Sequence, residues 1–157
     1  MPVRIFIHGL ESSNKGTKAV FFLKRYPDMI IPTFTGDLHA RMEKLNSVLS
    51  GKSDIRVVGS SFGGLMASLF AMENEHRVEK IILLAPAINV IRSYGLKSKK
   101  ISVPVKVYHG TNDGVIPLAE VDSMAREIFT DLSFNEVDDD HFLHKTFKSL
   151  EWDDLLA

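Results

Sequence analysis

The feature that most constrains the fold is the regular alternation of short apolar runs with helical patterns along the chain of 157 residues. The inner runs, such as "KIILLA", are hydrophobic at consecutive positions, which indicates strands covered on both faces. Such strands alternating with helices predict a doubly wound, mainly parallel sheet with right-handed crossovers. The expected strands cover residues 3–7, 29–31, 55–58, 80–84, 103–108 and 132–137. The strand at 132–137 is the most polar of these and is expected at an edge of the sheet.

Two segments between the strands have the apolar spacing of amphipathic helices. In "DLHARMEKLNSVLS", Asp37 is placed to cap a helix, and in "IPLAEVDSMAREIF", Pro117 suits a first helical turn. A composition of 45% hydrophobic and 25% charged residues is that of an ordinary globular protein. We therefore predict a single α/β domain spanning residues 1–157, with helices on both faces of about six strands.

Composition also excludes several classes of protein. The 19 basic and 20 acidic residues give a formal net charge of -1, so nucleic-acid binding is not expected. The absence of cysteine excludes disulfides, thiolate metal sites and a cysteine nucleophile. The apolar run in "MPVRIFIHG" is short and interrupted by an arginine, unlike a signal peptide or a membrane span. We expect a cytoplasmic protein without membrane contact, and its oligomeric state is left open.

The polar motifs follow the predicted strands at the points where these end. "HGLESS" follows the first strand, "GSSFGG" the third, "HGTNDG" the fifth and "DDDH" the sixth. In an open α/β sheet, ligands bind outside the carboxyl ends of the strands. The four motifs are therefore expected to meet at one edge of the sheet and to form the functional site.

The most specific motif is "GSSFG" at residues 59–63, which matches G-x-S-x-G. It fits in one register only, because a pattern centred on Ser60 would require glycine where Val58 stands. The motif predicts a sharp turn from strand to helix, on which Ser61 is the nucleophile. The N–H of Phe62 would then point toward a developing oxyanion at the start of the helix.

A serine nucleophile needs a base and a residue that orients this base. Asp113 follows the fifth strand and His141 the sixth, so the chain order is Ser61, Asp113, His141, as this architecture requires. Asp113 could also be a structural turn residue before Gly114. His144, one helical turn after His141, is a rival base.

Other polar residues suggest alternative sites. The acidic run 138–140 could hold a metal, but three adjacent carboxylates cannot all face one ion, so a solvated loop is the better interpretation. His8 and His109 are expected to be structural or to line the pocket. The stretch "GLESSNKGTK" resembles a phosphate-binding loop, yet Asn14 stands before Lys15 where that motif needs glycine.

From "FIHGLESS" through "GSSFGG" and "HGTNDGVIP" to "DDDHF", the chain resembles the α/β-hydrolase fold superfamily, in particular its small, lidless esterase-like members. The resemblance implies that the N–H of Leu10 is a second oxyanion donor beside that of Phe62. It also implies acyl transfer from a small ester or thioester through an acyl-enzyme on Ser61, with no metal or organic cofactor. The strand at 29–31 would lie outside the first strand, and the nucleophile strand would be central.

The sequence departs from the usual pattern of these hydrolases in three places. We expect no counterpart of the two N-terminal strands of the full fold, and Ser60 stands where relatives often have histidine. The segment 86–100 is too short for a cap domain, so we expect an open site that favours short acyl groups. Within it, residues 87–96 form either a flap that walls the acyl pocket or a surface helix. The alternative functions are a non-catalytic α/β-hydrolase-fold binding domain and, disfavoured by the failed loop motif, a phosphate-binding protein.

Overall fold

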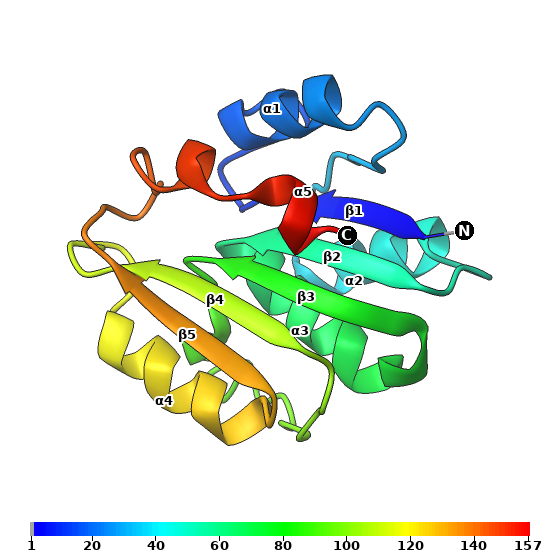
Figure 1. Cartoon of the computed structure of the whole chain (residues 1–157). Coiled ribbons are helices and arrows are strands. Elements are labelled where there is room, and N and C mark those ends of the chain that lie inside the picture. The colour runs from blue at the N-terminus through cyan, green and yellow to red at the C-terminus, as the bar shows by residue number, and fades with distance from the viewer. Residues whose placement is uncertain (1) are drawn as a thin grey trace.

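The computed structural model describes residues 2–157, which form one parallel sheet with helices on both faces (Figure 1). The five strands lie in the spatial order β1-β2-β3-β4-β5, and every neighbouring pair is parallel. They are β1 Val3–Ile7, β2 Ile55–Ser60, β3 Val78–Leu84, β4 Val105–Gly110 and β5 Leu132–Val137. The helices are α1 Thr17–Arg25, α2 Leu38–Val48, α3 Phe62–Glu73, α4 Leu118–Ile128 and α5 Trp152–Leu155. Three short 3-10 helices are η1 Glu75–Arg77, η2 Ile88–Val90 and η3 Phe147–Ser149.

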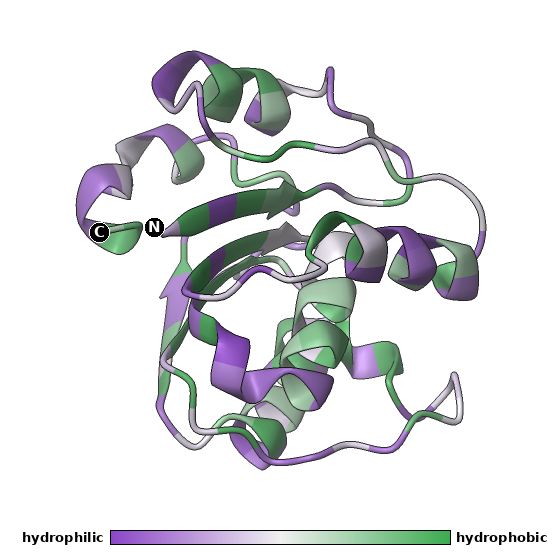
Figure 2. Cartoon of the chain, turned by 90° about the vertical axis from the view of Figure 1, so that its right-hand side faces the viewer, coloured by the Kyte–Doolittle hydropathy of each residue, from purple (hydrophilic) through white to green (hydrophobic). Residues whose placement is uncertain are grey.

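The sheet separates two apolar layers. Helices α2, α3 and α4 cover one face, whereas α1, α5 and η3 cover the other (Figure 1). Helix α3 packs mainly against β2 and also against β1 and β3. It is buried along most of its length and is the pale green helix at the centre of Figure 2. The predicted three-layer α/β/α class is therefore confirmed, as is the edge position of the polar last strand.

The expected strand at residues 29–31 is the one that does not form, whereas the strands expected at 55–58, 80–84 and 103–108 form with the bounds Ile55–Ser60, Val78–Leu84 and Val105–Gly110. Only Ile30 pairs with β1, where its N–H donates to the oxygen of Arg4 (2.8 Å) and its oxygen accepts from Phe6 (3.0 Å). Pro32 has no N–H and cannot extend this ladder. The sheet has five strands rather than six, and the bridge lies outside β1, on the side that the resemblance implied.

The helix ends agree with the sequence pattern where the pattern was clear. Asp37 caps α2 by accepting a hydrogen bond of 2.9 Å from the N–H of Ala40, and Pro117 directly precedes α4. Helix α1 was not predicted. It begins after Gly16 without a side-chain cap, and its apolar residues 19–23 are consecutive in sequence rather than spaced by helical turns.

Residues 87–96 form neither of the expected structures. They consist of the short helix η2 followed by turns, in place of a flap or a regular surface helix. Ile88 and Ile91 are fully buried in the core beside α4 and do not wall a pocket, whereas Tyr94 is exposed.

The assignment of residues 1–157 to a single domain stays a prediction. No helix within residues 2–157 is long and apolar enough to cross a membrane.

Candidate active site

Ser61 lies on the sharp turn between β2 and α3, as the motif predicts. Its backbone has φ 55° and ψ -118°, a conformation that residues other than glycine rarely adopt. The turn is fixed from β3, because the N–H of Ser61 donates to the oxygen of Leu84 (2.9 Å). The backbone carbonyl oxygen of Ser61 accepts hydrogen bonds from the N–H groups of Gly64 (2.9 Å) and Ala87 (2.8 Å). The strained conformation is therefore held from both sides.

The glycines of the motif allow the strand and the helix to approach closely. A Cβ atom on Gly63 would lie 2.0 Å from the carbonyl oxygen of Ile7 in β1, and one on Gly59 would lie 2.5 Å from the oxygen of Gly63. Neither position can accept a side chain without displacement of the backbone. Glycine thus brings the start of α3 against β1 and β2 and places Ser61 at the carboxyl edge of the sheet.

The three residues predicted to form a triad meet at this edge. His141 Nε2 lies 3.2 Å from Ser61 Oγ, and His141 Nδ1 lies 2.7 Å from Asp113 Oδ2. A carboxylate oxygen can only accept, so Nδ1 carries the hydrogen. In the neutral ring, Nε2 is then the free acceptor, and it faces the serine hydroxyl. Residues far apart in sequence, at the ends of β2, β4 and β5, are brought into a connected chain of contacts.

The carboxylate of Asp113 is held at both oxygens and is fully buried. Oδ1 accepts hydrogen bonds of 2.8 Å from the N–H groups of Val115 and Ile116, while Oδ2 faces His141. The backbone of the turn thus fixes the plane of the carboxylate and leaves one oxygen for the imidazole. The bonds to Val115 and Ile116 are those of a turn aspartate, so Asp113 has the predicted structural role in the turn as well as its contact with His141.

The loop that carries His141 is shaped by Asp139, a residue whose role the sequence did not reveal. Its carboxylate accepts from the N–H groups of Asp140 (2.8 Å), Lys145 (3.0 Å) and Thr146 (2.7 Å). Burial alone would raise the pKa of Asp139, but these N–H donors outweigh burial and hold the pKa below its usual value. The interpretation of the acidic run as a solvated loop is therefore wrong for Asp139, which is only 4% exposed.

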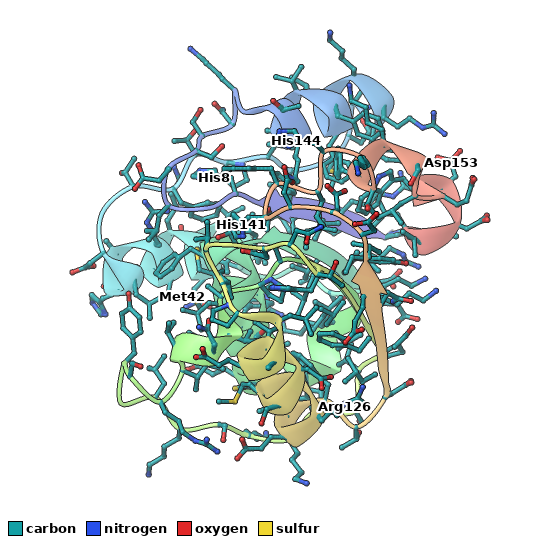
Figure 3. All side chains as sticks on the ribbon, turned by 90° about the vertical axis from the view of Figure 1, so that its left-hand side faces the viewer. His8, Met42, Arg126, His141, His144 and Asp153 are labelled. Atoms are coloured by element: carbon teal, nitrogen blue, oxygen red, sulfur yellow. The ribbon has the colours of Figure 1, made fainter. Side chains whose placement is uncertain are left out.

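The remaining histidines with candidate roles are used elsewhere. The Nδ1 atom of His144 lies 2.6 Å from Asp140 Oδ2, and the side chain is largely exposed, so it is engaged outside the contacts between Ser61, His141 and Asp113; Figure 3 labels it beside His141 and His8. His8 accepts the N–H of Phe34 at its Nε2 atom (2.9 Å), and burial lowers its pKa. The structural interpretation of His8 and the choice of His141 over His144 thus agree with the contacts.

The two predicted oxyanion donors flank the turn. Phe62 is the first residue of α3, and a Cβ on Gly9 would lie 3.3 Å from Ser61 Cβ, which places Leu10 directly after a residue in contact with the nucleophile. Within residues 2–157, the N–H groups of Leu10 and Phe62 donate to no protein acceptor. Both N–H groups are thus unpaired with protein, and their role as oxyanion donors stays a prediction.

Several apolar side chains lie in the loops beside the site residues. The ring of Phe142 packs edge-on against His141, with ring centroids 5.4 Å apart, and the ring of Tyr94 lies 6.3 Å from that of Phe62. Large apolar side chains that are exposed on the described surface gather in the loops of the site. These are Leu10, Tyr94, Val115 and Phe142, with only Leu23 elsewhere, on α1.

A parallel sheet with a strained serine turn at its carboxyl edge defines the class of α/β-hydrolase-fold proteins. Solved structures share this fold. Alpha/beta hydrolase domain-containing protein 10 from mouse is 20% identical with a TM-score of 0.77, and the match covers 95% of this chain and 84% of that one. A serine hydrolase homologue from Coxiella burnetii is 20% identical with a TM-score of 0.75, and coverage is 98% and 83%.

Residues 12–137 match the model of the dienelactone hydrolase family, and the chain therefore belongs to this family of hydrolases. The matched range includes Ser61 and Asp113 and ends before His141. A search of curated proteins finds no match. The predicted resemblance to α/β hydrolases is thus confirmed, whereas the roles of the individual site residues stay predictions.

Proposed function

We propose that this protein is a serine hydrolase of the carboxylesterase or thioesterase type, which cleaves a small ester or thioester with Ser61, His141 and Asp113. The observation that carries the proposal is the unbroken chain of contacts from Ser61 Oγ through His141 to Asp113, at 3.2 Å and 2.7 Å. Nucleophile, base and orienting acid are all within the reach that acyl transfer requires.

In the first half of the reaction, His141 Nε2 takes the proton of Ser61 Oγ as this oxygen bonds to the carbonyl carbon of the substrate. The N–H groups of Leu10 and Phe62 stabilise the negative oxygen of the tetrahedral intermediate. His141 then returns the proton to the oxygen or sulfur of the leaving group as its bond to carbon breaks. An ester of Ser61 remains.

In the second half, a water molecule gives a proton to His141 Nε2 and attacks the acyl carbon. Ser61 Oγ leaves with the proton from His141, and the carboxylic acid is released. Throughout, Asp113 keeps its charge, fixes the tautomer of His141 and stabilises the imidazolium form. All proton transfers pass through His141, and the proposed steps use no metal or organic cofactor.

The open site supports a small substrate. The shortness of segment 86–100 leaves Ser61 without a cap, and the exposed side chains of Leu10 and Phe142 give the entrance an apolar rim. We therefore propose short uncharged acyl groups as the preferred class. We also propose that the protein acts in the cytoplasm, on small molecules rather than on nucleic acids or membranes.

Covalent labelling with a fluorophosphonate tests the proposal. Wild type should carry the label on the peptide that contains Ser61, and Ser61→Ala should not be labelled. Ser60→Ala is the matched control, because it removes the neighbouring hydroxyl and should leave labelling intact. A folded wild type without label would favour the alternative of a non-catalytic binding domain. A panel of esters and thioesters graded by acyl length would then define the substrate class.

A further inference from the structure

A second histidine lies against the acid of the triad. His109 is near the end of β4, its side chain is fully buried, and its Nε2 atom is 3.2 Å from Asp113 Oδ2. The same Nε2 atom is 2.9 Å from the carbonyl oxygen of Ile116. Asp113 Oδ2 is therefore contacted by two imidazoles, those of His141 and His109. The proposed mechanism does not use His109.

The contact with Ile116 settles which ring nitrogen carries the hydrogen. A carbonyl oxygen can only accept, so Nε2 of His109 carries the hydrogen and donates it to Ile116, while the same atom lies in close contact with Asp113 Oδ2. Nδ1 of His109 is buried and has no partner within residues 2–157. Such an unpaired buried polar atom is unfavourable, and an apolar side chain of similar size would avoid this cost. The polar contact that an imidazole makes at this position is the hydrogen bond from its Nε2 atom to Ile116.

The hydrogen bond to Ile116 connects strand β4 to the turn that holds the acid. The N–H of Ile116 donates to Asp113 Oδ1 at 2.8 Å, while the carbonyl oxygen of the same residue accepts from His109. His109 thus ties the far end of the 113–116 turn back to the rigid sheet. If this bond is lost, the turn and the carboxylate can move relative to His141.

We propose that His109 is a positioning residue, which fixes the Asp113 turn on β4 and aims Asp113 Oδ2 at His141. The inference rests on the proposed function, because it assigns His109 a role in the same triad. His109 acts through Asp113 and does not contact Ser61 or the substrate. Its contribution should therefore be seen in kcat rather than in KM.

Two substitutions separate positioning from packing. His109→Leu keeps the volume and removes the donor, whereas His109→Gln keeps an N–H group at about the place of Nε2. The measurements are the rate constant for fluorophosphonate labelling of Ser61, kcat and KM for a small ester, and the thermal unfolding of each variant. The exposed His76 on η1 gives the control His76→Leu.

His109→Leu should lower the labelling rate and kcat by about ten- to a hundredfold, since a misplacement of about 1 Å can have an effect of this size. KM should stay within about twofold, and His109→Gln should recover most of the rate. Wild-type rates in folded His109→Leu, or equal losses in both folded variants, would overturn the proposal. An unlabelled wild type would instead overturn the proposed function itself, and the assignment of His109 with it.

Discussion

The side-chain ammonium of Lys18 on α1 donates a hydrogen bond of 2.7 Å to the carbonyl oxygen of Phe142, the residue that follows His141. Burial lowers the pKa of Lys18, while the carboxylates of Asp140 and Asp139 act in the opposite direction. One outer helix is thus attached to the loop that supplies the proposed base. The helix that the sequence pattern did not predict is in contact with the site.

Replacement of Lys18 should therefore affect catalysis from outside the triad. Lys18→Met removes the donor to Phe142, so the loop gains freedom, and we expect labelling of Ser61 to slow several-fold with a loss of stability of about 1 kcal/mol. Lys24→Met, on an exposed position of the same helix, should change neither quantity. Equal rates for the two variants would show that Lys18 does not support the loop.

Asp139 should make the stability of the protein depend on pH. Its pKa is lower in the folded state than in the unfolded chain, so it stabilises the fold above the unfolded value of about 3.9, and this contribution is lost as the pH falls through the folded pKa. Asp139→Asn should lower the free energy of unfolding at neutral pH by about 2 kcal/mol. Urea unfolding from neutral to acid pH should show the difference from wild type shrinking, whereas the exposed Asp138→Asn should give a small and constant effect.

The two histidines near the end of the chain should differ sharply. His141→Gln removes the proposed base and should reduce kcat by at least about a thousandfold. His144→Gln affects only an exposed ring that contacts Asp140, so kcat should stay within about threefold of wild type. Steady-state kcat values of the two variants on a small ester test this difference. A larger loss of kcat in His144→Gln than in His141→Gln would exclude His141 as the base.

Close packing at the turn predicts an unusually large stability effect at Gly63. A Cβ atom there would overlap the carbonyl oxygen of Ile7, so Gly63→Ala should lower the free energy of unfolding by about 4 kcal/mol or more, or prevent folding. Gly114→Ala is the steric control, because nothing lies within 4 Å of its added methyl group. Thermal unfolding of both variants tests the difference, and similar midpoints would contradict the close approach.

The sequence was informative where chemistry follows from residue type and order. The glycine spacing selected Ser61, and the order of strand ends selected Asp113 and His141, which the structure brings together. It could not reveal Lys18 or Asp139, because their roles depend on contacts with backbone groups that no motif encodes. The segment around Ile30 was predicted as a strand but forms a single bridge. Whether its neighbours also pair with β1 depends on the path of the chain, which the apolar pattern does not encode.

The backbone conformation of Ser61 has a consequence for how this chain responds to selection. A serine with φ 55° and ψ -118° costs about 1–3 kcal/mol, which glycine would largely avoid. Ser61→Gly should therefore unfold at a temperature equal to or above that of wild type while losing all labelling, and a clear loss of stability would contradict this. A directed-evolution screen that rewards only thermal resistance would be expected to enrich inactive variants at this position.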